Sequence, residues 1–236
     1  MIAISRTAMV LAAGFGKRMG GLILNTPKPL LPIGNTNCLE ISILALVKAG
    51  FQRIIINTHY LSEQIVAFSK RFNDVEIIIS HELQLLETAG GVRKVLNEFE
   101  NKNFVVVNAD MYWMDSDPSI IFSLQKTMQA DDHFCLGVVP LENAVAHPGK
   151  GDFIFANGLL HKSATDDNSQ KFVYMGVQII NPKIIEPLAT DDPMSLAPLY
   201  FKASSADKLR GSVFKSLWVD VGTPGGLEKA RLCRNC

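Results

Sequence analysis

The sequence predicts an α/β fold in which a doubly wound, mostly parallel mixed sheet is flanked by helices. Apolar runs typical of buried strands recur at residues 8–12, 54–56, 75–79 and 104–107. The segments between these runs carry features of helices. Strands and helices that alternate at this spacing are typical of a parallel sheet wound on both faces.

The predicted connecting helices have recognisable ends. Residues 39–49 carry apolar side chains at helical spacing, and the run stops at Gly50, which favours a helix C-cap. Ser62 is expected to cap a helix over residues 63–71. A further helix is expected at residues 91–99, directly before the fourth strand.

The pattern changes after Asp110, where short strands and loops replace the regular alternation. No linker, internal repeat or low-complexity segment divides the chain, so we expect a single domain over residues 1–236. Its two halves cover about residues 1–110 and 111–236. In the second half we expect, in order, a loop at 111–117, a helix at 118–129, strands at 134–139, 152–155, 159–161 and 172–180, a helix near 181–188, a segment at 195–202, a strand at 212–219 and a closing helix at 224–232.

The composition is that of a globular protein without an electrostatic bias. Of the 236 residues, 47% are hydrophobic and 19% are charged, and the formal net charge is zero. A neutral chain supplies no overall field that would attract nucleic acid or an anionic membrane. No apolar run reaches the length of a membrane span, no signal peptide is visible, and four cysteines do not form a disulfide framework in a chain of this length. We therefore expect a cytoplasmic protein without nucleic acid or membrane partners.

A glycine turn followed by cations ends the first predicted strand. Gly14 and Gly16 let the backbone turn sharply and leave N–H groups free to meet a ligand. Lys17 and Arg18 follow at once, and Lys28 comes after a short loop. A strand, a glycine turn and three cations in this order suit the phosphates of a nucleotide.

Two common phosphate motifs do not fit this stretch. A dinucleotide fingerprint needs a third glycine where Met19 stands, and a Walker A loop from Gly16 needs a lysine where Leu22 stands. A NAD-dependent dehydrogenase is therefore only a distant alternative. An ordinary strand-to-helix turn with solvated charges is the plainer interpretation of the same residues.

Two aspartates that follow apolar strands are candidates for a metal site. Asp110 comes shortly after the run at residues 105–107, and Asp220 follows Trp218 and Val219. In open α/β sheets, ligands bind at the carboxyl ends of the strands. Mg2+ usually takes one or two protein carboxylates and completes its shell with phosphate oxygens and water. The alternative is that each aspartate caps a turn or a helix.

Residues 11–19, with the sequence L-A-A-G-F-G-K-R-M, are followed after a short gap by P-K-P-L at residues 27–30. This pair of motifs resembles the signature of sugar-phosphate nucleotidyltransferases. The resemblance implies the Rossmann-like, GT-A-like fold of nucleotide-diphospho-sugar transferases. It also implies that the first half binds the nucleotide and the second half binds the sugar phosphate.

Further motifs resemble the branch of this family that uridylylates N-acetylmuramate 1-phosphate. The resemblance runs from about Thr7 to the final helix. Residues 87–91 resemble the loop E-T-[AG]-G-G, which approaches the base and ribose in relatives. The sequence departs from relatives at residues 20–23, at residues 37–38 and at Asn108. The matching stretches lie at residues 87–91, 147–148, 151–153, 174–176, 196–199 and 218–223.

The resemblance implies transfer of a nucleotidyl group from a nucleoside triphosphate to a sugar 1-phosphate with release of pyrophosphate. The substrates it favours are UTP and N-acetylmuramate 1-phosphate, which would place the enzyme in cell-wall sugar recycling. Arg18 would contact the leaving β- and γ-phosphates, Lys28 would contact the α-phosphate or the sugar phosphate, and Asp110 and Asp220 would hold Mg2+ as the cofactor. The implied nucleotide-binding residues are Ala12, Ala13, Gly14, Gly16, Lys17, Thr88, Ala89, Gly90 and Asn108. The implied sugar-binding residues are Asn143, Asp152 and Gly176.

Two other functions remain open at this point. A mannose- or heptose-1-phosphate guanylyltransferase shares the phosphate machinery and differs in its base and sugar pockets. A catalytically silent, nucleotide-binding regulatory paralogue is supported only by Gly20, Gly21 and Ile23, which replace residues usual in relatives. The expected partners are a nucleoside triphosphate and a sugar 1-phosphate, and the chain is expected to be a monomer or a small homo-oligomer.

Overall fold

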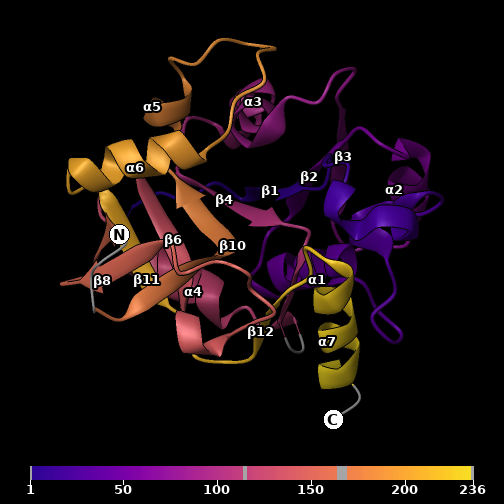
Figure 1. Ribbon diagram of the computed structural model, residues 1–236. Coiled ribbons are helices and arrows are strands. Elements are labelled where there is room, and N and C mark those ends of the chain that lie inside the picture. Colours follow the sequence, from indigo (N-terminus) through magenta and orange to yellow (C-terminus); the bar gives the residue numbers. More distant parts are fainter. Residues whose placement is uncertain (1, 114–115, 164–168, 235–236) are drawn as a thin grey trace.

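A nine-stranded mixed sheet forms the centre of the molecule (Figure 1). The computed structural model describes residues 2–113, 116–163 and 169–234. The strands of this sheet are β1 (Thr7–Leu11), β2 (Arg53–Thr58), β3 (Glu76–His81), β4 (Phe104–Asn108), β6 (Phe134–Pro140), β8 (Phe153–Ala156), β9 (Leu159–Lys162), β10 (Lys171–Ile180) and β11 (Leu209–Val213). Their order across the sheet is β3-β2-β1-β4-β10-β6-β11-β9-β8.

The helices connect these strands and lie on both sides of the sheet. The α-helices are α1 (Cys38–Lys48), α2 (Ser62–Ser69), α3 (Glu87–Lys94), α4 (Ser119–Thr127), α5 (Pro182–Ile185), α6 (Ala197–Ser205) and α7 (Pro224–Arg234). Short 3-10 helices are η1 (Lys17–Ile23), η2 (Lys28–Leu30), η3 (Leu96–Phe99) and η5 (Leu141–Asn143). The elements of the first half thus follow the alternation that the sequence predicts.

The apolar runs of the first half form a parallel set of strands. β1 pairs with β2 on one side and with β4 on the other, so that Val10 lies opposite both Ile56 and Val107. All three of these side chains are completely buried. β10 then runs antiparallel between β4 and β6, which makes the sheet mixed. The predicted fold class is confirmed.

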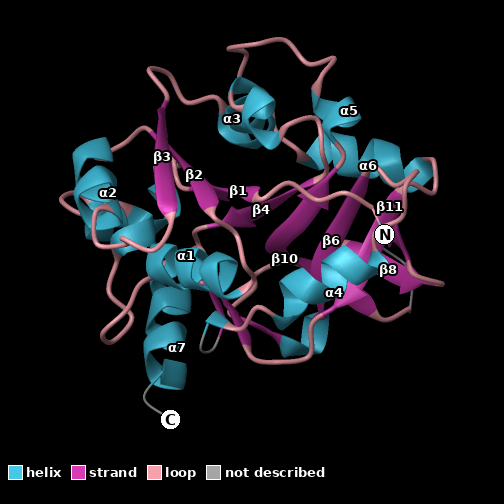
Figure 2. Cartoon of the chain, turned by 180° about the vertical axis from the view of Figure 1, so that it is seen from behind, coloured by secondary structure: helices cyan, strands magenta, loops and turns pink. Residues whose placement is uncertain are grey.

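Successive residues of β1 point into two separate cores, because side chains alternate between the faces of a strand. Ala8 and Val10 belong to a core that also contains buried residues of α1, α4 and α7. Met9 belongs to a second core that contains buried residues of α3 and α6. Figure 2 shows α1 and α4 on the near face of the sheet. The larger sheet is therefore covered on both faces.

A three-stranded second sheet joins distant parts of the chain. Its strands are β5 (Met111–Trp113), β7 (Ala144–Val145) and β12 (Trp218–Asp220), and β12 lies between the other two. β12 runs antiparallel to β5 and parallel to β7. Trp113 and Trp218 lie opposite each other in this pairing, and both are completely buried.

The expected capping role of Ser62 is wrong. The N-cap of α2 is Leu61, which has a φ of 50°, and no side chain caps the helix. The Ser62 hydroxyl instead shares a hydrogen bond of 2.8 Å with Thr58 Oγ1 at the end of β2. The Ser62 hydroxyl therefore links β2 to α2 and does not accept a hydrogen bond from the first backbone N–H groups of α2.

The third helix begins earlier than predicted, at Glu87 rather than at residue 91. Its first turn has no side-chain cap. The N–H groups of Ala89 and Gly90 instead donate to the Met194 carbonyl, at 2.7 and 3.2 Å. The carbonyl of Met194, distant in sequence, therefore accepts hydrogen bonds from N–H groups in the first turn of the helix, as a capping side chain would. The stretch E-T-A-G-G, expected to be a loop, forms the first part of this helix.

Two predictions for the second half also need correction. Residues 111–113 form β5 rather than a loop, whereas residues 114–115 lie outside the described residues. The strand predicted at residues 212–219 is divided between β11 and β12, which belong to different sheets. β11 pairs with β6, and the Phe214 N–H makes the last bond of this edge, to Val138 O at 2.8 Å. The chain then leaves the large sheet to reach β5.

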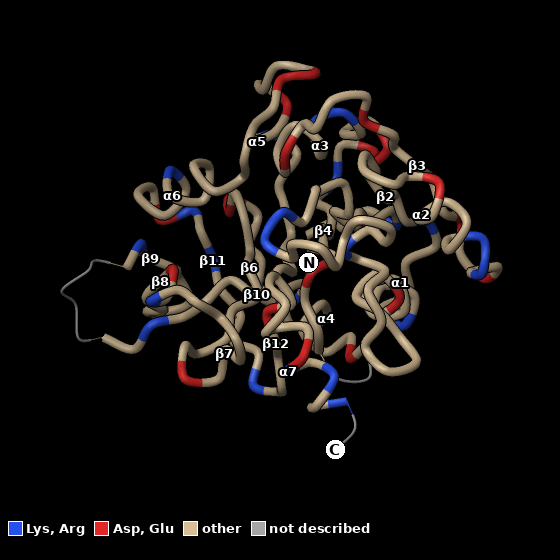
Figure 3. The backbone as a smooth tube through the Cα atoms, turned by 45° about the vertical axis from the view of Figure 1, so that its right-hand side comes forward, with Lys and Arg blue, Asp and Glu red and all other residues tan. Residues whose placement is uncertain are grey.

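Basic and acidic residues are interspersed along the chain that the structure describes (Figure 3). No helix in that part of the chain is both long enough and apolar enough to cross a bilayer. The ion pair between Arg210 and Asp132 lies in the interior. Arg210 Nε on β11 lies 2.6 Å from Asp132 Oδ2, and the Asp132 side chain is only 3% exposed. Asp132 also accepts the Gln129 N–H, so this pair holds the turn before β6.

Replacing Arg210 with methionine would keep an aliphatic stem and leave the buried Asp132 carboxylate without its cation. We expect the free energy of unfolding to fall by about 3 kcal/mol, measured by urea denaturation. Arg53 provides the control, because its ion pairs with Glu76 and Glu98 are both much more exposed, and Arg53→Met should cost about 1 kcal/mol or less. Equal losses in the two variants would contradict a special contribution from the buried pair.

Candidate active site

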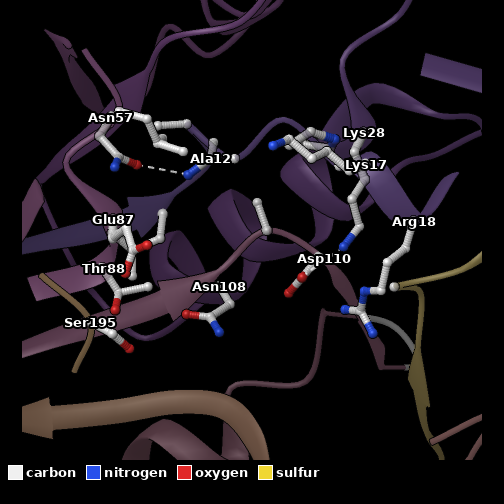
Figure 4. Close-up of a pocket in the computed structure, with 18 residues that line it drawn as sticks. Ala12, Lys17, Arg18, Lys28, Asn57, Glu87, Thr88, Asn108, Asp110 and Ser195 are labelled. Atoms are coloured by element: carbon white, nitrogen blue, oxygen red, sulfur yellow. Dashed lines mark hydrogen bonds and ion pairs between the residues drawn. The ribbon is translucent and has the colours of Figure 1, made fainter. Parts of the chain in front are cut away.

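A cavity of about 420 Å³ lies at the carboxyl ends of β1, β2 and β4. This is the edge at which open α/β sheets bind their ligands. Figure 4 shows Lys17, Arg18 and Lys28 on one side, here called the cationic end, and Asn57, Glu87 and Thr88 on the other, here called the polar end. The predicted site residues that line the cavity are Ala12, Ala13, Gly14, Gly16, Lys17, Arg18, Lys28, Thr88, Asn108 and Asp110.

Lys28 is the most firmly held of the three cations. Its side chain is 9% exposed, and its Nζ lies 2.7 Å from Asp110 Oδ2. Gly16 permits this position, because its φ is +66° and a Cβ there would come within 3.0 Å of Lys28 Cβ. The second glycine of the turn therefore makes room for the lysine as well as bending the backbone.

The second sheet brings Asp220 next to Asp110. Asp220 lies opposite Met111 in the pairing of β12 with β5, and the Val221 N–H donates to the Asp110 carbonyl at 3.1 Å. Asp110 itself lines the cavity. Asp220 is not part of the lining, but it lies next to the lining residue Gly222. Two aspartates far apart in sequence thus lie on adjacent backbone segments at one edge of the cavity.

Hydrogen bonds and a cation hold the Asp220 carboxylate in its ionised form. Burial raises the pKa of Asp220, but hydrogen bonds from His147 and the Gly222 N–H and the charge of Arg18 together bring the pKa below its usual value. His147 Nδ1 lies 3.4 Å from Oδ2, and the Gly222 N–H donates to Oδ1 at 2.7 Å. A Cβ on Gly222 would lie 2.6 Å from Asp220 Oδ1 and 2.7 Å from Arg18 Nη2. Gly222 therefore lets the aspartate and the arginine approach the same point.

At the polar end, side chains from β2 and α3 line the cavity. Asn57, at the end of β2, accepts the Ala12 N–H on its Oδ1 at 2.7 Å. Thr88 Oγ1 accepts the Leu196 N–H at 2.8 Å and so fixes the start of α6. Glu87 has a φ of +58°, a conformation that is uncommon for a residue with a side chain. Its carboxylate lines the cavity.

Ala89 and Gly90 do not line the cavity, although the resemblance implies that they bind nucleotide. Their N–H groups are already bonded to the Met194 carbonyl. A Cβ on Gly90 would come within 2.6 Å of the Asp192 carbonyl oxygen. The small size of Gly90 therefore serves packing between α3 and the segment before α6.

The three implied sugar-binding residues also lie outside the cavity lining. Asn143 is exposed at the end of η5. Asp152 accepts the Tyr174 N–H on its Oδ2 at 2.9 Å, which ties the start of β8 to β10. Gly176 has a φ of +87° in the irregular part of β10, and a Cβ there would lie 3.2 Å from Asn108 Cβ. Gly176 thus lies beside Met111 and the lining residue Asn108 without lining the cavity itself.

Asn57 and Ser195 line the cavity but are not among the residues predicted from sequence, and Glu87 is predicted only as part of the motif at residues 87–91. Asn57 directly follows the apolar run at residues 54–56, so the rule that ligands bind at strand ends points to it. Glu87 opens the stretch at residues 87–91 that resembles a family motif, but its positive φ could not be foreseen from the sequence. Ser195 comes from the segment before α6, far from the other lining residues in sequence.

A glycine turn, three cations and Asp110 at the strand ends of a mixed α/β sheet, with Asp220 on a neighbouring strand, are typical of a nucleotide-binding protein equipped for phosphate chemistry. The sequence matches the nucleotidyl transferase family over residues 7–233. The chain therefore belongs to that family. Its recognition from sequence as a sugar-phosphate nucleotidyltransferase is confirmed, and so is its assignment as an enzyme.

The chain is similar to several characterised proteins of more than one specificity. An N-acetylmuramate alpha-1-phosphate uridylyltransferase of Caulobacter vibrioides is 28% identical to it over 226 residues, which cover 93% of each chain. A D-glycero-alpha-D-manno-heptose 1-phosphate guanylyltransferase of Aneurinibacillus thermoaerophilus is 26% identical, over 95% of this chain and 96% of the relative. The crystal structure of HddC from Yersinia pseudotuberculosis superposes with a TM-score of 0.78 at 22% identity, covering 99% of this chain and all of that one.

The environment of Asp220 predicts a pH-dependent contribution to stability. Since the pKa of native Asp220 is lowered, its ionised form stabilises the fold above about pH 4, and this contribution is lost as the pH falls through the native pKa. We expect the unfolding free energy of the wild type to exceed that of Asp220→Asn at about pH 6, and the difference to shrink toward about pH 3. Urea denaturation at each pH measures this difference. A difference that stays constant over the range would contradict the assigned environment.

Proposed function

We propose that the enzyme forms a nucleoside diphosphate sugar and pyrophosphate from UTP and N-acetylmuramate 1-phosphate. The observation that carries the proposal is the cavity itself, with buried Lys28 beside Asp110 at one end and a wall of polar groups at the other. The uridylyltransferase of Caulobacter vibrioides, similar along nearly the whole chain, supports this choice of substrates. The reaction would serve cell-wall sugar recycling in the cytoplasm, carried out by one domain over residues 1–236 acting as a monomer or small homo-oligomer.

The residues of the cationic end suit an in-line transfer. A phosphate oxygen of the sugar phosphate attacks the α-phosphorus of the nucleotide, one P–O bond forms, and the bond to the departing pyrophosphate breaks. The second pKa of a phosphate monoester lies near 6, so the nucleophile is ionised at neutral pH and needs no general base. Arg18 neutralises the leaving β- and γ-phosphates, and Lys28 neutralises the α-phosphate or the sugar phosphate. Positioning and charge neutralisation then carry the catalysis.

Asp110 and Asp220 fit a divalent cation. Asp110 Oδ1 is buried and has no hydrogen-bond partner among the described residues, so an acceptor is left for a ligand. The described residues contain no group of three or more His, Cys, Asp or Glu side chains suited to a metal. A site with only two protein carboxylates suits Mg2+, which draws its other ligands from phosphate oxygens and water. Bound there, Mg2+ would supply Lewis-acid stabilisation of the phosphate charge.

A guanylyltransferase acting on heptose or mannose 1-phosphate is the second candidate. The relative from Aneurinibacillus thermoaerophilus acts on a heptose 1-phosphate and is nearly as similar in sequence as the uridylyltransferase. Both reactions require the same cationic end. They differ in the base and in the sugar, and therefore in what the polar end must recognise.

Pyrophosphate release in the presence of Mg2+ tests the substrates. UTP, GTP, CTP and dTTP are each combined with the 1-phosphates of N-acetylmuramate, mannose, heptose, glucose and N-acetylglucosamine. We expect release with UTP and N-acetylmuramate 1-phosphate. Release with GTP and a heptose or mannose phosphate would overturn the substrate assignment and keep the reaction class. Nucleotide binding without release in any combination would instead indicate a regulatory protein.

Removal of either assigned cation should slow turnover strongly. We expect Arg18→Ala and Lys28→Ala each to lower kcat/KM on the order of 100-fold, because each loses a charge-assisted contact to a phosphate. Lys150→Ala is the matched control, since Lys150 is exposed and does not line the cavity. Turnover close to wild type in Arg18→Ala or Lys28→Ala would remove that residue from the mechanism.

A further inference from the structure

A fully buried carboxylate lies behind the polar end of the cavity and is not part of its lining. The Glu82 side chain is 0% exposed. Its Oε1 accepts Asn57 Nδ2 at 2.8 Å, and its Oε2 accepts the Leu86 N–H at 2.9 Å. No ion pair to Glu82 is found among the described residues. A buried charge compensated by hydrogen bonds alone is costly, so such groups need well-placed partners.

The hydrogen bonds of Glu82 connect two walls of the cavity. Asn57 links Glu82 to the loop after β1, because its Oδ1 accepts the N–H of Ala12, the first residue after that strand. Leu86 carries the other connection, since it directly precedes Glu87 and Thr88. Ala12, Asn57, Glu87 and Thr88 all line the cavity. One occluded carboxylate therefore braces both the loop after β1 and the start of α3.

The same bonds fix which way the Asn57 amide points. An ionised carboxylate only accepts hydrogen bonds, and both neighbours of Glu82 here are donors. Asn57 must therefore turn its NH2 group to Glu82, which leaves its oxygen to accept from Ala12. We propose that Glu82 is a positioning residue for the nucleotide, acting through Asn57 and Leu86 on the polar end of the cavity. This inference rests on the proposed function, because it assumes that the cavity binds a nucleoside triphosphate.

Gly91 supports this role independently. A Cβ at position 91 would lie 2.9 Å from both Asn57 Nδ2 and Glu82 Oε1, the two atoms of the central hydrogen bond. Any larger residue must push that bond apart. Gly91, the second glycine of E-T-A-G-G, therefore leaves room for the hydrogen bond between Asn57 and Glu82 and does not line the cavity.

A glutamine at position 82 has nearly the same shape but the wrong set of donors. If the glutamine oxygen accepts the Leu86 N–H, the glutamine NH2 group faces the Asn57 NH2 group. If Asn57 flips to avoid this clash, its NH2 group then meets the Ala12 N–H. If glutamine itself flips, its NH2 group meets the Leu86 N–H. Each arrangement leaves one buried donor facing another, whereas an aspartate at position 57 satisfies every donor again.

The test compares Glu82→Gln, Gly91→Ala and the double variant Asn57→Asp/Glu82→Gln. For Glu82→Gln and Gly91→Ala we expect the KM for UTP to rise about tenfold, with kcat changed less than about twofold. The double variant should recover most of the loss in KM. Gly225→Ala is the matched control for Gly91→Ala, because a Cβ at that glycine meets nothing within 4 Å, and its KM should equal that of the wild type. If the wild type uses GTP, the same measurements are made with GTP.

The outcomes separate the two proposals. Wild-type protein that releases no pyrophosphate with any nucleotide contradicts the proposed function. An active wild type with an unchanged nucleotide KM in Glu82→Gln and Gly91→Ala contradicts the positioning role alone, even if the melting temperatures fall. A double variant no better than Glu82→Gln would also contradict it. If Glu82→Gln does not fold, the comparison of Gly91→Ala with Gly225→Ala and the behaviour of the double variant decide the question.

Discussion

The pairing of β12 with β5 is the constraint on which the active site depends. Asp110 follows the central strand β4, whereas Asp220 lies near the end of the sequence. The two meet because Asp220 stands opposite Met111 and the Val221 N–H donates to the Asp110 carbonyl. Trp218 secures this pairing, since it is fully buried and its Nε1 donates to a backbone carbonyl of β10 at 3.0 Å. A site closed in this way exists only after the second half of the chain has folded onto the first.

The parts of the site that sequence predicts are those that local rules determine. Apolar runs long enough for buried strands predict the sheet, and the residue that follows each run is placed at its ligand-binding edge. Gly14, Gly16, Arg18 and Lys28 line the cavity because they directly follow β1 or lie in the short segment after it. Asp110 follows β4 in the same manner. In each case a few neighbouring residues contain the relevant information.

The parts that sequence does not predict depend on partners distant in the chain. The Met194 carbonyl accepts the N–H groups at the start of α3, so no capping side chain near Glu87 marks the start of this helix in the sequence. Glu82 carries no visible signal, because its role depends on folding against Asn57 and Gly91. Ala89, Gly90 and Gly91 are small residues whose motif suggests ligand contact, but in the fold they pack against the protein. Glycine indicates a close approach, but only the fold shows whether a ligand or another part of the protein approaches.

The ion pair of Lys28 with Asp110 shows how the fold prepares the cationic end. A lysine that is only 9% exposed has already lost most of its water, and the 2.7 Å contact with Asp110 compensates for that loss. In the proposed reaction, Lys28 would exchange one anionic partner for another when the triphosphate binds, without being desolvated again. Asp110, whose other oxygen has no protein partner in the described chain, would then be available to the proposed cation. The cost of burying the Lys28 charge is met during folding, so the proposed binding and transfer would require little reorganisation of that side chain.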